Sequence, residues 1–140
     1  RVAAAARAAR GRILLTGRTD NYLNGRPDLD DTVKRLAAFA EAGADVLFAP
    51  GLPDMDAIRA VVRAVAPKPV NVVVGPGVPL SALAEAGVKR VSIGGALYRT
   101  ALAATGASLD TLIDGRLDLA FKNAIPSATL RDLLPPARGA

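Results

Sequence analysis

The chain has 140 residues, 51% of them hydrophobic, so it is long and apolar enough for one domain with a core and is not a disordered polymer. Its net charge is +5, but the arginines are scattered and aromatic residues make up only 4%, which argues against nucleic-acid binding and favours small anionic ligands. Histidine and cysteine are absent, which excludes disulfide bonds, thiolate chemistry and imidazole catalysis.

The first twelve residues, RVAAAARAARGR, are rich in alanine and arginine and predict a helix. They lack the apolar core of a signal peptide, and no later window has transmembrane length. We therefore expect a cytoplasmic protein that does not bind membranes. Because Arg1 stands where a natural chain would have methionine, we also expect a fragment, a processed product or an incompletely recorded chain.

Four apolar runs, at 13–16, 46–49, 70–74 and 90–93, are too short for helices and predict buried strands. Their starts are separated by about 33, 24 and 21 residues, the βα period of a parallel α/β fold. Amphipathic stretches between them predict three helices. The residues on their apolar faces are Leu29, Val33, Leu36 and Ala40, then Ile58, Val61, Val62 and Val65, and then Leu80, Leu83 and Ala84.

Helix-boundary signals support these assignments. Asp28 lies at the predicted N-cap of the first helix, with Asp30 and Asp31 in its first turn, where carboxylates meet unpaired N–H groups. We interpret this acidic set as capping rather than as a metal site. Gly43 and Gly87 each follow Glu-Ala and are expected to end a helix before a strand.

No linker divides the chain, so we expect a single domain, 1–140, with a helical tail from about residue 107. The tail is expected to hold one or two short helices, with Leu130, Leu133 and Leu134 before two prolines as its clearest apolar face. Four βα units are half of an eight-stranded barrel and would leave two strand edges exposed. Either the other half precedes Arg1, or the sheet is open and doubly wound, or two copies complete one another.

Parallel α/β folds bind ligands at the carboxyl ends of their strands, which directs attention to Arg18. Its planar fork of donors suits a carboxylate or phosphonate, although a structural pair with Asp20 is equally compatible with the spacing. Asn71 is polar inside an apolar strand and contacts either a ligand or a neighbouring loop, and the pattern favours the structural role. Gly94 and Gly95 could open an anion-binding helix, or could serve close packing.

Four segments carry a family resemblance: "GRTD" at the end of a strand, "GRPDLDDTVKRLAAFAEAGADVLFAPGL", "KPVNVVV" and "AGVKRVSIGGALYRTAL". In this order and spacing they resemble the isocitrate lyase and phosphoenolpyruvate mutase superfamily, particularly its small bacterial mutase-like members. The resemblance covers roughly residues 13 to 103. It implies an α/β fold that is the C-terminal half of a (β/α)₈ TIM barrel, with four parallel βα units followed by C-terminal helices.

The resemblance also implies a chemistry. Members of the superfamily bind Mg²⁺ and make or break C–C or P–C bonds beside a carboxylate, through an enolate-like species. Arg18 matches the arginine that holds the anionic group of the substrate, and is therefore assigned as a catalytic and substrate-binding residue. Asn71 matches the asparagine at the substrate, whereas Gly94 and Gly95 are assigned to substrate binding from their position after a strand. The metal-binding aspartates of the superfamily belong to the first half of the barrel, so no metal ligand is assigned in this chain.

One departure narrows the expected reaction. The lyases carry a glutamate just after the strand matched by 46–49, where this chain has Pro50 or its neighbours. This argues against a true isocitrate or methylisocitrate lyase and favours mutase-like or oxaloacetate-processing members. We therefore expect a Mg²⁺-dependent lyase or phosphonomutase-like enzyme acting on a small 2-oxo acid or phosphonate.

Two alternatives stay open. The chain could be an inactive truncated half barrel or a subunit that completes another chain. Less favoured is a barrel that binds a phosphate near Gly94 and Gly95. By resemblance we also expect a homo-oligomer, with a C-terminal helix that swaps between subunits.

Overall fold

The computed structural model describes residues 1–75 and 77–134. The chain forms two compact units, Arg1–Gly94 and Gly95–Ala140, where the sequence predicted a single domain. The boundary therefore lies between two of the predicted site glycines, and the helical part begins earlier than the expected residue 107. Each unit is described by itself below.

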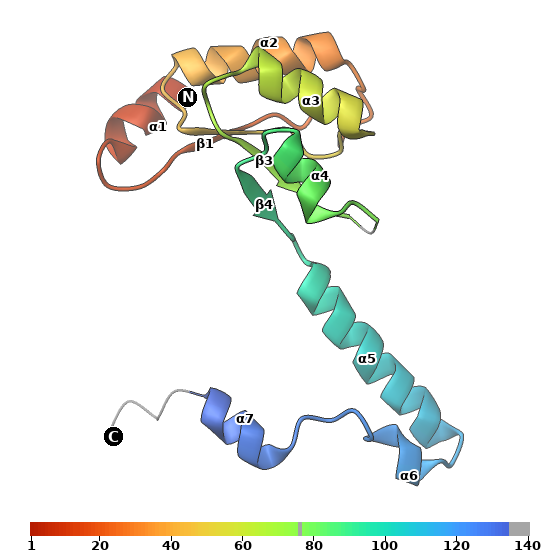
Figure 1. Cartoon of the computed structure of the whole chain (residues 1–140). Coiled ribbons are helices and arrows are strands. Elements are labelled where there is room, and N and C mark those ends of the chain that lie inside the picture. The colour runs from red at the N-terminus through yellow and green to blue at the C-terminus, as the bar shows by residue number, and fades with distance from the viewer. Residues whose placement is uncertain (76, 135–140) are drawn as a thin grey trace. The chain divides into compact units, whose positions relative to one another are not determined.

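The first unit is an α/β structure in which four parallel strands alternate with helices (Figure 1). The strands are adjacent in chain order, β1-β2-β3-β4, as in successive units of a (β/α)₈ barrel. The four-unit α/β prediction is therefore confirmed. Its elements are α1 (Val2–Ala9), β1 (Thr16–Arg18), α2 (Leu29–Glu41), β2 (Val46–Phe48), α3 (Met55–Ala64), β3 (Val70–Val73), α4 (Leu80–Glu85) and β4 (Arg90–Ser92).

Strand β1 begins later than its apolar run predicted. Ile13 and Leu14 are 70% and 77% exposed and lie in the connection from α1. Backbone pairing with the next strand starts at Leu15, whose carbonyl accepts from the N–H groups of Asp45 and Val46. The strand therefore ends on the charged residue Arg18 instead of stopping before it.

The helices cover one face of the sheet, so the doubly wound alternative is wrong. Side chains alternate between the faces of a strand, and Leu47 and Val70 point to the face where α2 and α3 contribute Leu36 and Val61 to the main core. Leu83 of α4 anchors a second cluster on this face. Helices confined to one face are the barrel arrangement, since the other face becomes the barrel interior.

We call the opposite side of the sheet the concave face. Alternation assigns it the side chains of Thr16, Arg18, Val46, Phe48, Asn71, Val73, Arg90 and Ser92. Arg90 Nη1 donates to Thr16 Oγ1 at 3.0 Å, which joins the last strand to the first. Because β2 and β3 lie between these strands, the bond shows that the sheet curves toward this face.

The predicted helix boundaries are confirmed where they concern α2 and α4. The N–H of Asp31 donates to Asp28 Oδ1 at 2.9 Å, which is the predicted N-cap bond of α2. Gly43 and Gly87 follow α2 and α4 with φ of 99° and 86°, a left-handed conformation that favours glycine.

The second unit contains helices α5 (Ala96–Ile113), α6 (Leu117–Ala120) and α7 (Ser127–Leu133). Helix α5 runs without interruption through residue 107, near which the helical tail was expected to begin. Leu130, Leu133 and Leu134 are exposed, and the two prolines that follow them lie outside the described residues. Within residues 1–75 and 77–134, no helix is long and apolar enough to cross a membrane.

Candidate functional site

Sheet register brings the two main predicted site residues into one row. Arg18 pairs with Phe48, Phe48 with Asn71, and Asn71 with Arg90, so these four residues cross the sheet from β1 to β4. All four are on the concave face because paired residues of parallel strands point to the same side. Arg18 is the last residue of β1, at the carboxyl end where parallel α/β proteins bind ligands.

Arg18 makes the structural pair that the sequence left open and still keeps donors available. Its Nε donates to Asp20 Oδ1 at 2.7 Å, and the two side chains are 49% and 43% exposed. Such an exposed pair contributes little to stability. The guanidinium carbon lies 5.3 Å from the centre of the Phe48 ring. The two Nη groups make no hydrogen bond to any described residue, so an anion can approach that edge of the fork.

Asn71 is 2% exposed, and only one of the two polar atoms of its side-chain amide has a hydrogen-bond partner among the described residues. Nδ2 donates to Ser92 Oγ at 3.0 Å, so its partner lies on the neighbouring strand β4 and not in a loop. Oδ1 is buried and has no hydrogen-bond partner among the described residues. Leaving such a group unpaired costs about 1–3 kcal/mol, so the concave face holds an acceptor that its protein neighbours do not satisfy.

A polar loop follows β1 and holds Arg18 in place. The N–H of Thr19 donates to the carbonyl of Phe48 at 3.0 Å, and Thr19 Oγ1 donates to Asn21 Oδ1 at 2.7 Å. Asn21 and Arg35 both donate to Asp31, each at 2.6 Å. These bonds lower the pKa of Asp31 and raise the pKa of Arg35, because each favours the charged form of its group.

The same loop borders a polar cavity of about 590 Å³ beside Arg18, to which Asp31, Arg35 and Arg26 also contribute. Tyr22 lies in this loop as well. Its pKa is raised by burial and then by the charges of Asp28 and Asp54, because each of these disfavours the phenolate.

The two glycines after β4 are explained by backbone geometry. Gly94 has a φ of 52°, and Gly95 is the N-cap of α5 without a side-chain capping bond. A Cβ on Gly94 would meet Val73 Cγ2 at 3.8 Å, an ordinary contact, so the conformation and not close approach requires glycine there. Their assignment to substrate binding stays a prediction.

The described residues do not by themselves provide a metal site. Residues 1–75 and 77–134 contain no group of three or more His, Cys, Asp or Glu side chains placed to hold a metal ion. Asp28 caps α2 as predicted. Asp31 has a different role, because its side chain accepts hydrogen bonds from Asn21 and Arg35.

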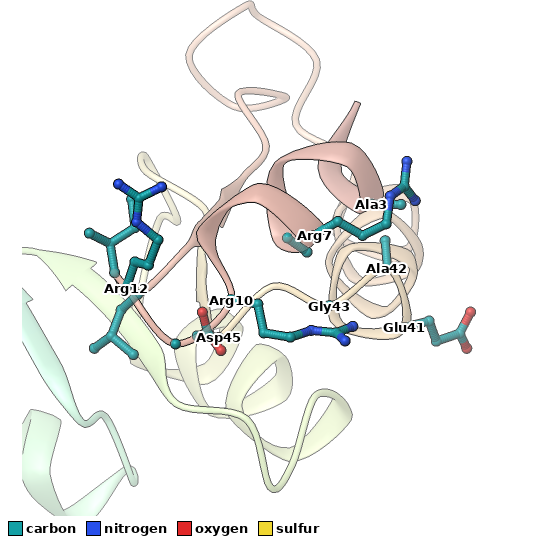
Figure 2. Close-up of a pocket in the computed structure, with 12 residues that line it drawn as sticks. Ala3, Arg7, Arg10, Arg12, Glu41, Ala42, Gly43 and Asp45 are labelled. Atoms are coloured by element: carbon teal, nitrogen blue, oxygen red, sulfur yellow. The ribbon is translucent and has the colours of Figure 1, made fainter.

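A larger cavity lies away from this site. It has a volume of about 850 Å³ and is formed by α1, the segment before β1 and the end of α2 (Figure 2). It is therefore at the amino-terminal end of the strands. Arg7, Arg10 and Arg12 line it, but their guanidinium groups point in different directions and do not converge on one anion (Figure 2). We therefore prefer the smaller polar cavity beside Arg18, because ligands bind at the opposite end of parallel sheets.

Sequence reasoning missed three polar residues of the concave face. The predicted strand runs 13–16 and 90–93 contain Thr16, Arg90 and Ser92, but the pattern assigns none of the three to the site. Their alternation with apolar neighbours was the available signal. Their partners, however, are 21 and 74 residues away in the chain, and only the sheet register brings them together.

Comparison with known proteins relates this arrangement to one family. The family model described as phosphoenolpyruvate phosphomutase matches residues 1–113. A crystal structure from Burkholderia cenocepacia J2315, described as a lyase/mutase, is 49% identical with a TM-score of 0.86, covering 94% of this chain and 49% of its own. A second from the same organism, described as a phosphonomutase, is 39% identical with a TM-score of 0.69, covering 79% and 48%. A search of curated proteins found no match.

A more distant structure supports the fold alone. The 2,3-dimethylmalate lyase of the PEP mutase/isocitrate lyase superfamily is 24% identical with a TM-score of 0.77, covering 93% of this chain and 48% of its own. The chain thus spans about half the length of the structures that it matches. The match over residues 1–113 includes all four parallel βα units. The chain therefore belongs to the phosphoenolpyruvate phosphomutase family.

Proposed function

We propose that this chain supplies the anion-binding part of a lyase or mutase site that acts on a small 2-oxo acid or phosphonate through an enolate-like intermediate. The observation that carries the proposal is the row that joins Arg18 and Asn71. There, one guanidinium edge and one buried amide oxygen lack partners among the described residues. The relatives described as a lyase/mutase and a phosphonomutase support this class of reaction.

In this proposal each residue has a separate task. Arg18 binds the carboxylate or phosphonate through its Nη edge, while Asp20 keeps the guanidinium plane oriented through Nε. Asn71 accepts a hydrogen bond from the ligand or from a bound water molecule, which removes the cost of its unpaired Oδ1. The apolar residues Val46 and Phe48 on the same face lower the local dielectric and strengthen these contacts.

Membership in the family suggests dependence on a divalent metal ion, and Mg²⁺ is the ion that the resemblance implies. The described residues do not fit such a site on their own. No step is therefore assigned to a metal, and the proposal concerns only how the protein side chains bind and orient the anion.

Replacing Arg18 with lysine tests the proposal, because lysine keeps the charge but loses the fork. We expect Arg18→Lys to weaken binding of pyruvate, measured by titration calorimetry or NMR, by about 1–2 kcal/mol, roughly five- to thirty-fold. Arg63→Lys is the matched control, since Arg63 is exposed on α3. If both variants bind like the parent chain, Arg18 does not belong to the site.

A second candidate function is that of a non-catalytic half barrel that completes another chain. It is favoured by one observation: β1 and β4 each have a neighbour on one side only within the described sheet. Exposed strand edges pair readily with further strands. Light scattering coupled to size-exclusion chromatography distinguishes the two candidate functions. A complementing subunit should associate through the edge strands β1 and β4. Pro substitutions in these strands should then abolish the association.

We also propose that the whole protein is a homo-oligomer that uses the second unit. Twelve large apolar side chains of this unit are exposed, among them Leu97, Leu109 and Phe121. Among the described residues of the unit, Ala120 is the one apolar residue that is buried. Apolar surface of this kind is typical of subunit interfaces. A chain ending at Gly94 should then be monomeric while the full chain associates, as measured by light scattering.

A further inference from the structure

We infer that Phe48 is a positioning residue for Arg18, and that its ring holds the guanidinium plane in the orientation that leaves the Nη edge open to an anion. This inference rests on the proposed function of Arg18 and adds to it a residue that need not touch the ligand. It begins with the register of the sheet, in which Phe48 on β2 lies directly opposite Arg18 on β1. Both side chains are on the concave face, because paired residues of parallel strands point to the same side.

The contact between the two side chains joins a cation to an aromatic face. The guanidinium carbon of Arg18 lies over the Phe48 ring, 5.3 Å from its centre. A cation within about 6 Å of the centre of an aromatic ring is attracted by the negative face of the ring, and the planar guanidinium can also stack on it. An aliphatic side chain on this part of β2 would provide apolar surface but no such attraction.

Asp20 and Phe48 restrain the guanidinium in two different ways. Asp20 accepts from Nε at 2.7 Å, which fixes one corner of the plane but still allows the plane to turn about that bond. The Phe48 ring lies beside the central carbon and therefore restricts this rotation. With Nε and the ring side engaged, the Nη edge is the part of the fork that has no hydrogen-bond partner among the described residues.

Arg18 needs a second restraint because its side chain is exposed. It is 49% accessible, so few packing contacts limit its rotatable bonds, and the exposed ion pair with Asp20 is weak by itself. Orienting the side chain before the ligand arrives lowers the entropic cost of binding. Phe48 is well placed to do this, since β2 lies between β1 and β3 and the Phe48 carbonyl accepts from the N–H of Thr19 at 3.0 Å. The ring thus connects the exposed guanidinium to an inner strand of the sheet.

The orientation of Arg18 is tested first without a ligand. In a proton–nitrogen correlation spectrum, the Nε–H resonance of Arg18 is the signal that Arg18→Lys removes. The ring current of an aromatic face moves such a proton to lower frequency, so we expect Phe48→Leu to move the resonance back to higher frequency. Phe48→Tyr keeps the ring and should keep the shift. Phe121→Leu, the same change at an exposed site of the second unit, should have no effect. An Arg18 resonance that Phe48→Leu leaves in place would overturn the inference.

Binding of pyruvate then tests the role of Phe48 in the site. Phe48→Leu keeps an apolar side chain on the concave face and removes only the ring. We expect it to weaken pyruvate binding about two- to five-fold in titration calorimetry, and Phe48→Tyr to retain most of the affinity. In an Arg18→Lys background the same change should have a smaller effect, because lysine has no plane to orient. Equal losses in the two backgrounds would show that Phe48 acts independently of Arg18 and would refute the positioning role.

The outcomes separate this inference from the proposed function. If the parent chain does not bind pyruvate, or Arg18→Lys leaves binding unchanged, the proposed anion site is wrong and the role of Phe48 falls with it. If Arg18→Lys weakens binding but Phe48→Leu does not, the proposed function stands and only the inference on Phe48 is refuted. Phe48→Met, a second variant without the ring, should behave like Phe48→Leu. Circular dichroism of each variant checks that the losses do not come from unfolding.

Discussion

The two units bury their apolar residues to very different extents. In the first unit, Leu36, Leu47 and Val61 are completely inaccessible, and they belong to a core shared by α2, β2 and α3. In the second unit, the longest helix, α5, has no buried residue at all, although it contains several leucines. The first unit therefore has a core of its own, whereas the second has apolar surface that its described residues leave uncovered.

The largest predicted effect comes from a substitution in the core of the first unit. Leu47→Ala should lower the free energy of unfolding by about 2–5 kcal/mol, because it leaves a cavity beneath α2 and α3. Leu109→Ala in α5, where the leucine is 53% exposed, should change the stability of the isolated chain by less than about 0.5 kcal/mol.

Each unit has its own optical probe for this measurement. The chain has no tryptophan and two tyrosines, Tyr22 in the first unit and Tyr98 in the second. Tyrosine fluorescence in urea, recorded in Tyr22→Phe and Tyr98→Phe backgrounds, therefore follows the units separately. Equal losses for Leu47→Ala and Leu109→Ala would contradict the difference in burial between the units.

A smaller effect is expected from helix capping, which also differs between the units. Asp28 caps α2 through a side-chain bond, whereas α5 and α7 begin without one. Asp28→Ala should cost about 1 kcal/mol of unfolding free energy. Asp30→Ala, in the same first turn but without a capping bond, is the control and should cost less. Urea unfolding followed by the Tyr22 signal measures both, and a larger loss for the control would refute the capping role.

The smallest predicted effect is a dependence of stability on pH. The pKa of Asp31 lies below its ordinary value of 3.8, chiefly because of the hydrogen bond from Arg35 and then that from Asn21. Asp31 therefore binds a proton more readily in the unfolded state than in the folded state. Its contribution to the free energy of unfolding is complete above about pH 5 and is lost as the pH falls through the pKa that Asp31 has in the folded state. The stability difference between the parent chain and Asp31→Asn should therefore shrink between pH 5 and pH 3 in urea unfolding. Asp114→Asn, in an exposed ion pair of the second unit, is the control. A difference that does not change over this range would show that the bonds to Asp31 do not stabilise the first unit.

Local chemistry explains which features the sequence predicted well. Three predictions depend on residues close in the chain, and each was confirmed. They are the period of the strands, the capping by Asp28 and the ends of two helices at Gly43 and Gly87. The errors were at boundaries. Apolar character placed β1 too early, because the exposed Ile13 and Leu14 precede the point at which backbone pairing begins. The start of the helical tail was placed too late because α5 has no marked polar face to reveal it.

The sequence alone determined the α/β class, the four βα units and the family resemblance, and it directed attention to Arg18 and Asn71, because periodicity and motifs are encoded in neighbouring residues. Only the tertiary structure decided that the chain forms two compact units and that the helices of the first cover one face of its sheet. It also decided how Asn71 meets Ser92 and how Arg90 reaches Thr16. These contacts join residues 21 and 74 positions apart, and they depend on strand register and sheet curvature, which no local pattern encodes.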